Sequence, residues 1–153
     1  MSVRVSDRNQ SKVEYIYNAQ QMCYLVRDRI TKYANKVANS TRYKHFTKSS
    51  DYSVWNSPIY HAQMVYQYCQ LANRERDTIK RLDYLSNAGR NLELLETSTQ
   101  TFYDKYRKIV KDKFMVLLAT HIKYQKDLLK GCIKLAKSVS CSQPLPPRHW
   151  YLG

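Results

Sequence analysis

The sequence predicts an all-α protein, folded as an antiparallel up-down bundle of four long helices. Two observations support this prediction. The chain has 153 residues but only three glycines and four prolines, so few of its residues form turns. Apolar residues also recur at steps of three and four over long stretches, which is the period of one helix face. No run approaches the 18 or more apolar residues of a membrane span, and none is expected.

The first helix is expected to begin near Ser11, with Glu14 as its capping-box partner, after a polar arm of residues 1–11. Its apolar stripe has 3–4 spacing and consists of Ile16, Ala19, Cys23, Val26, Ile30, Tyr33 and Val37. The periodicity is then lost over residues 39–56, which predicts a loop. There Arg42, Lys44 and Lys48 alternate with aromatic residues. Either the aromatic side chains pack against the bundle edge, or the loop contacts phosphates and stacks bases.

The second helix is predicted to start at Ser57-Pro58, a hydroxyl N-cap followed by proline at the first helical position. It ends between Asn73 and Arg76. The third helix starts near Asp77 or Thr78 and runs to about Asp104. Because the connection is so short, these two helices are expected to be antiparallel neighbours. The predicted buried stripe of the third helix is Ile79, Leu82, Leu85, Ala88, Leu92, Leu95, Thr99, Phe102 and Tyr106.

The fourth helix follows a weakly marked break at residues 104–107. No glycine or proline lies there, so a single kinked rod is the alternative to a turn. The predicted apolar stripe is Val110, Phe114, Leu117, His121, Tyr124, Leu128, Gly131 and Leu135. The helical bundle domain is expected to span residues 12–137. Residues 138–153 contain Pro144, Pro146 and Pro147, which predicts an irregular tail.

One face of the fourth helix is rich in lysine. The residues are Lys123, Lys126, Lys130, Lys134 and Lys137. Like charges at this spacing repel each other by about 0.2–0.5 kcal/mol per pair. An anionic partner alongside would offset this repulsion, and a solvated lysine face is the alternative interpretation.

The net charge of the chain is +14, from 26 Lys and Arg against 12 Asp and Glu. Residues 1–57 and 105–153 carry most of the excess, while residues 58–104 are close to neutral. A basic surface built from the two ends of the chain is expected to bind a polyanion, with nucleic acid as the first choice. A second basic cluster surrounds the turn between helices two and three and consists of Arg74, Arg76, Lys80 and Arg81.

Several enzyme signatures are missing from the sequence. The four glutamates form no Glu-x-x-His pair of a di-iron bundle, and no phosphate loop or His-Glu-x-x-His motif occurs. His121 is interpreted as a core histidine. The four cysteines form no C-x-x-C pair, and no apolar signal segment precedes the first helix. We therefore expect free thiols in a reducing cytoplasm, without catalysis, cofactor or metal.

Short motifs resemble a bacterial and phage family of four-helix bundles. They are the Ala72-Asn73 pair, the stretch from Lys80 to Leu85, Ala88, and the stretch from Leu92 to Leu95, with Val13 to Ala19 similar to the first helix of clostridial-type members. The family includes proteins encoded in intervening sequences of 23S ribosomal RNA genes. It also includes the accessory variability determinant (Avd) of diversity-generating retroelements.

The resemblance implies a homopentameric ring with a basic surface that binds a reverse transcriptase and its template RNA. In this role the protein supports mutagenic complementary-DNA synthesis without being an enzyme. The phosphate-binding residues are then expected among the lysines of the fourth helix and among Arg42, Lys44 and Lys48, with the turn cluster as a second candidate. The bound strand is RNA, DNA or an RNA/DNA hybrid. The alternative is a basic scaffold of the intervening-sequence type, which binds RNA or an acidic protein without a reverse transcriptase.

Overall fold

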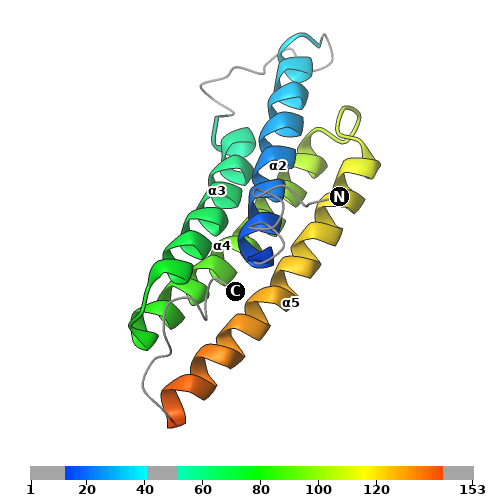
Figure 1. Ribbon diagram of the computed structural model, residues 1–153. Helices are drawn as coiled ribbons and strands as arrows, with labels where there is room; N and C mark the ends of the chain where they lie inside the picture. Colours follow the sequence, from blue (N-terminus) through cyan, green and yellow to red (C-terminus); the bar gives the residue numbers. More distant parts are fainter. Residues whose placement is uncertain (1–12, 41–51, 143–153) are drawn as a thin grey trace, which may run out of the picture.

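The computed structural model describes residues 13–40 and 52–142, and this part of the chain contains four α-helices and no strand (Figure 1). The helices are α2 (Glu14–Ala38), α3 (Tyr52–Arg74), α4 (Thr78–Lys105) and α5 (Asp112–Ser142). The all-α prediction is confirmed. Helix α2 packs mainly on α3 and α5, and α4 packs mainly on the same two helices, with the α3–α4 pairing the most extensive.

Contacts between the helices show which of their ends meet. At the start of α2, the Tyr15 hydroxyl donates to Asn73 Oδ1 at the end of α3, at 3.2 Å. Near the end of α2, the Tyr33 ring packs edge-on against Phe114 at the start of α5, with centroids 5.7 Å apart. The start of α2 therefore lies beside the end of α3, and the end of α2 beside the start of α5.

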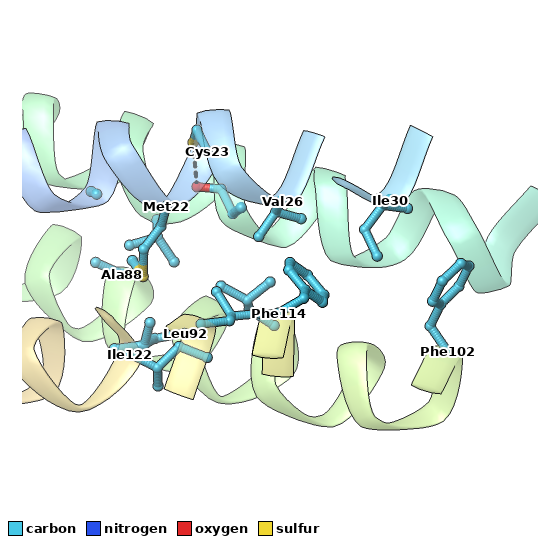
Figure 2. Close-up of a cluster of buried hydrophobic side chains, with 14 of the residues drawn as sticks. Met22, Cys23, Val26, Ile30, Ala88, Leu92, Phe102, Phe114 and Ile122 are labelled. Atoms are coloured by element: carbon cyan, nitrogen blue, oxygen red, sulfur yellow. Dashed lines mark hydrogen bonds between the residues drawn. The ribbon is translucent and has the colours of Figure 1, made fainter. Parts of the chain in front are cut away.

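The core runs between the four helices and receives apolar side chains from each of them. In Figure 2, Met22 and Val26 of α2 point toward Leu92 of α4 and toward Phe114 and Ile122 of α5. Helix α3 contributes small residues at its buried positions, such as Ala62 and Ala72. Small side chains allow neighbouring helices to approach closely, and the Cys23 thiol indeed donates to the Ala62 carbonyl at 3.0 Å.

Two predicted helix starts are wrong. Val13 occupies the N-cap of α2 without a side-chain cap, and Ser11 lies outside the described residues. Helix α3 begins at Tyr52 rather than at Ser57, so Pro58 lies inside it. Proline removes one helical hydrogen bond. The earlier turn is nevertheless formed because Val54 and Trp55 pack against the core.

The start of α4 agrees with the prediction. Asp77 is its N-cap, and the Asp77 carboxylate accepts from the Lys80 backbone N–H at 3.0 Å. The predicted stripe fails only at its beginning. Ile79 is 79% exposed, whereas Arg81 is 4% exposed. Two successive steps of three residues rotate the helix face by about 120°, whereas alternating steps of four and three hold it in place. Arg81 continues that alternation back from Leu85, and Ile79 does not.

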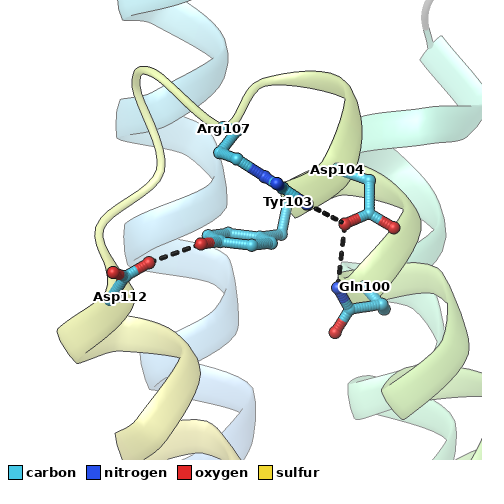
Figure 3. Close-up of polar contacts among 5 residues, drawn as sticks. All are labelled: Gln100, Tyr103, Asp104, Arg107 and Asp112. Atoms are coloured by element: carbon cyan, nitrogen blue, oxygen red, sulfur yellow. Dashed lines mark hydrogen bonds and ion pairs between the residues drawn. The ribbon is translucent and has the colours of Figure 1, made fainter.

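A turn separates α4 from α5, so the alternative of a single kinked rod is wrong. Tyr106 caps α4, and Tyr106 and Val110 are both buried in the turn. Polar contacts stabilise its outer side (Figure 3). The Tyr103 hydroxyl donates to Asp112 at 2.5 Å, and Arg107 pairs with Asp104 at 3.1 Å. The buried side chains of Tyr106 and Val110 and these polar contacts stabilise the turn, although it contains no glycine or proline.

The predicted buried stripe of α5 is also wrong over most of its length. The buried residues are Phe114, Leu118, Ile122, Gln125, Leu129 and Ala136, whereas Leu117, Tyr124 and Leu135 are exposed. The core-facing row lies one residue further along the chain, apart from the shared Phe114. Helix α5 also continues to Ser142, beyond the predicted boundary at residue 137, because the first proline of the tail is Pro144. Residues 143–153 lie outside the described residues.

Candidate nucleic-acid interface

The two flanks of α5 differ in chemistry. On the flank beside α4, Lys126 Nζ lies 3.1 Å from Glu96 Oε1 of α4. On the flank beside α2, the Tyr124 hydroxyl donates to the Glu14 carboxylate. The lysines follow the α4 side, where Lys123, Lys130, Lys134 and Lys137 are exposed and Lys126 is half-buried. The exposed Leu117, Tyr124 and Leu135 follow the α2 side.

The lysine flank borders a groove between α4 and α5 of about 560 Å³. Arg90 of α4 lines this groove together with Lys126 and Lys130 of α5. The same wall carries Glu93, which offsets one of these charges. Sequence reasoning missed Arg90 because it lies in the near-neutral middle of the chain, and only the packing of α4 on α5 brings it beside the lysines. The groove therefore joins three cations from two helices.

Gly89 lies on the α4 wall of this groove, and a Cβ built at that position would meet nothing within 4 Å. Glycine is unfavourable in a helix interior compared with alanine. Packing among the described residues does not require a glycine at this position. Sequence reasoning missed Gly89, which could have been found as a glycine inside a predicted helix.

The second predicted cluster is divided by the structure. Arg74, Arg76 and Lys80 are exposed at the α3–α4 turn, which lies at the same end of the molecule as the last part of α5 (Figure 1). Arg81 is buried, so its prediction as a surface phosphate ligand is wrong. Burial raises the pKa of the Cys132 thiol to about 11, and the nearby Arg81 charge acts in the opposite direction. Arg81 thus belongs to the interior between α4 and α5.

The predicted cations of the loop, Arg42, Lys44 and Lys48, lie outside the described residues. A smaller hollow of about 250 Å³ does carry three cations that were not predicted as ligands, namely Arg29, Lys111 and Lys113. It lies between α2 and the start of α5, beside the buried rings of Tyr33 and Phe114. It lies near the α4–α5 turn, whereas the groove borders the second half of α5.

A buried polar network fixes α5 against α2 behind these surfaces. His121 Nδ1 lies 2.8 Å from Asn18 Oδ1, and Asn18 Nδ2 donates to Gln125 Oε1 at 2.9 Å. Gln125 Nε2 then donates to the Tyr15 carbonyl at 2.7 Å. Burial lowers the pKa of His121. Its ring nitrogen has a partner, but the His121 side chain is half-buried at the edge of the core, so its interpretation as a core histidine holds only in part.

Three cysteines are free thiols: Cys23 and Cys69 are buried and Cys132 is half-buried. Burial raises the pKa of Cys23 to about 11 and raises that of Cys69 further. All three are therefore protonated at neutral pH and behave as small apolar side chains. In the described ranges, no group of three or more His, Cys, Asp or Glu side chains is placed to hold a metal ion.

Within residues 13–40 and 52–142, no helix is both long and apolar enough to cross a membrane. Comparisons with protein-family models, with characterised proteins and with solved structures found no match to this chain. The family resemblance therefore remains a prediction from sequence motifs.

Proposed function

We propose that this protein is a non-catalytic nucleic-acid-binding accessory protein, folded as an antiparallel up-down bundle. The contacts between opposite ends of neighbouring helices support the bundle topology. The observation that carries the function is the lysine flank of α5, which keeps its charges together and acquires Arg90 from α4 at the groove. Phosphate groups offset the repulsion within such a row and release counterions on binding.

The motif resemblance supports the finer form of this proposal. In it, the protein belongs to a diversity-generating retroelement and binds the reverse transcriptase and its template RNA during mutagenic complementary-DNA synthesis in the cytoplasm. Lys123, Lys126, Lys130, Lys134 and Lys137 contact phosphates, with Arg74, Arg76 and Lys80 extending the path at the same end of the molecule. Loop residues Arg42, Lys44 and Lys48 remain candidates from the sequence.

The same proposal includes a homo-oligomer, a pentameric ring by resemblance. Exposed Leu117, Tyr124 and Leu135 on the α2-side flank of α5 support it, because they repeat at intervals of seven and eleven residues along one helix face. Rows of exposed apolar residues at such spacing are typical of helix–helix interfaces. The oligomer interface and the lysine flank then use opposite sides of α5.

A matched pair of variants tests nucleic-acid binding. One replaces Lys123, Lys134 and Lys137 by glutamine, and the other replaces the exposed Lys32, Lys36 and Lys108, so both lose the same charge. Binding of a labelled oligo-uridine RNA of about 20 nucleotides is measured by fluorescence anisotropy. We expect the first variant to bind about tenfold or more weakly and the second to change less than about threefold. Equal losses would contradict a site on α5.

A retroelement role has a separate test. The proposal predicts a reverse-transcriptase gene beside the gene of this protein. Reconstitution with that enzyme should yield template-directed complementary DNA only when the protein is present. Binding of RNA without any effect on an adjacent polymerase would instead favour the scaffold of the intervening-sequence type.

A further inference from the structure

The seam between α4 and α5 is hollowed along most of its length. The groove of about 560 Å³ already described, with Arg90, Lys126 and Lys130, forms one part. A second hollow of about 250 Å³ follows it toward the α4–α5 turn and is lined by Thr99, Met115, Val116 and Ala119, among others. The Lys126–Glu96 ion pair joins the two helices between the hollows, since Lys126 lines the first and Glu96 the second.

The two hollows together have the length of a short helix. Along α4 they extend from Leu85 to Gln100, which corresponds to about 22 Å at 1.5 Å per residue. A helix of about 15 residues has this length. The seam is therefore long enough to contact one face of a further helix of about four turns.

Packing among the described residues does not explain three features of the seam. Gly89 lowers the helix propensity of α4 although nothing occupies the space beside it. Val116 is 67% exposed at the edge of the second hollow. The Thr99 hydroxyl is 1% exposed and has no hydrogen-bond partner among the described residues. A helix lying in the seam would approach Gly89 closely and cover Val116.

We propose that the α4–α5 seam binds an amphipathic helix of a partner protein, with acidic residues in the half that meets Arg90, Lys126 and Lys130. Such recognition places the apolar stripe of a helix in a groove, and flanking charges set its direction. In this arrangement the apolar side chains of the partner fill the hollow beside Val116 and Ala119. The proposal shares Lys126 and Lys130 with the proposed nucleic-acid site but goes beyond it, because it does not require RNA binding.

Charge and side-chain chemistry select this partner over two others. A second copy of this chain carries a net charge of +14, and its lysine-rich helix would be repelled by the basic groove. Single-stranded nucleic acid is bound by aromatic side chains that stack on the bases. Among the described residues, neither hollow is lined by an aromatic ring on which a base could stack, so RNA would contact Lys126 and Lys130 through its phosphates alone. An acidic helix with an aliphatic stripe matches both the basic and the apolar part of the seam.

The test uses a synthetic, fluorescein-labelled peptide of about 15 residues, the length set by the helix rise. Its leucines repeat at helical spacing and form one apolar face. Its glutamates lie beside that face in one half of the peptide. A scrambled peptide of the same composition lacks the stripe. Gly89→Met fills the basic hollow and folds without a clash, because a Cβ there meets nothing within 4 Å. Thr120→Met is the control, because Thr120 is exposed on α5 and lines neither hollow.

We expect the full-length protein to bind the designed peptide more tightly than the scrambled one. Gly89→Met should weaken peptide binding about tenfold or more, whereas Thr120→Met should bind the peptide within about twofold of the parent. Equal binding of the two peptides, or unchanged peptide binding by Gly89→Met, would overturn the proposal. The lysine-to-glutamine variants test RNA binding separately.

Discussion

Gln125 holds three helices together through one side chain. It is fully buried on α5, accepts from Asn18 of α2, and donates to the Tyr15 carbonyl of α2 and to Cys69 Sγ of α3. Both ends of its amide therefore have partners. An unsatisfied buried polar group costs about 1–3 kcal/mol, so the rotation of α5 that buries Gln125 depends on these partners.

Arg81 is expected to stabilise the fold rather than bind nucleic acid. We predict that Arg81→Ala lowers the free energy of unfolding by about 2–4 kcal/mol, because it removes a large side chain that is 4% exposed. Its exposed neighbour Lys80 provides the control, and Lys80→Ala should change the free energy by less than about 0.5 kcal/mol. Urea denaturation followed by circular dichroism measures both. Similar values for the two variants would contradict the interior role of Arg81.

His121 should make stability depend on pH. Burial lowers its pKa in the folded state, so the unfolded chain binds a proton at a higher pH than the folded chain does. Stability is then fully present above the unfolded pKa of about 6.5 and is lost as the pH falls toward the folded value. Between pH 7.5 and a lower pH, the free energy of unfolding should fall less in His121→Gln than in His61→Gln. Denaturation at each pH measures this difference. Identical pH profiles for these variants would count against this assignment.

At the scale of the helices, Gly89 is the clearest departure from helix propensity. We predict that Gly89→Ala stabilises the protein by about 0.5–1 kcal/mol, because alanine has less backbone entropy to lose and the new methyl group meets nothing within 4 Å. Thermal and urea denaturation measure the change. A destabilised Gly89→Ala protein would mean that the space beside α4 is filled.

Sequence periodicity predicted the existence and type of the four helices but not the rotation of α5. Helix α5 has two adjacent apolar rows, one through Leu117 and Leu135 and the other through Leu118 and Leu129. Their hydrophobicity is similar, so pattern alone does not choose between them. The deciding residue is Gln125, which is polar by type and becomes suitable for the core only through partners on α2 and α3.

The sequence predicted only part of the candidate site, because some of its residues come together only through tertiary packing. Lys123 to Lys137 were found because charges repeated along one helix are visible in sequence. Arg90 was not found, because its place beside Lys130 follows from how α4 meets α5. Arg81 was assigned wrongly, since a cation in a basic turn is normally exposed and only tertiary packing buries it.

For the whole molecule, the exposed apolar row on α5 should determine the oligomeric state. Leu117→Glu with Leu135→Glu is expected to reduce the assembly to a monomer of 18.2 kDa, because it places charges in an apolar helix contact. Leu94→Glu is the control, since Leu94 is as exposed as Leu117 but lies on α4. Light scattering after size-exclusion chromatography gives the mass. A monomeric mass for the unsubstituted protein would contradict the proposed pentameric ring.

The salt dependence of RNA binding tests the central claim most directly. The affinity for single-stranded RNA should fall with salt along a log–log line whose slope is about −0.7 for each phosphate neutralised. Replacing Lys123, Lys134 and Lys137 by glutamine should make this slope shallower by about 2, the contribution of three contacts. An affinity that is indifferent to salt, or a slope that the three substitutions leave unchanged, would contradict phosphate binding by the lysine flank of α5.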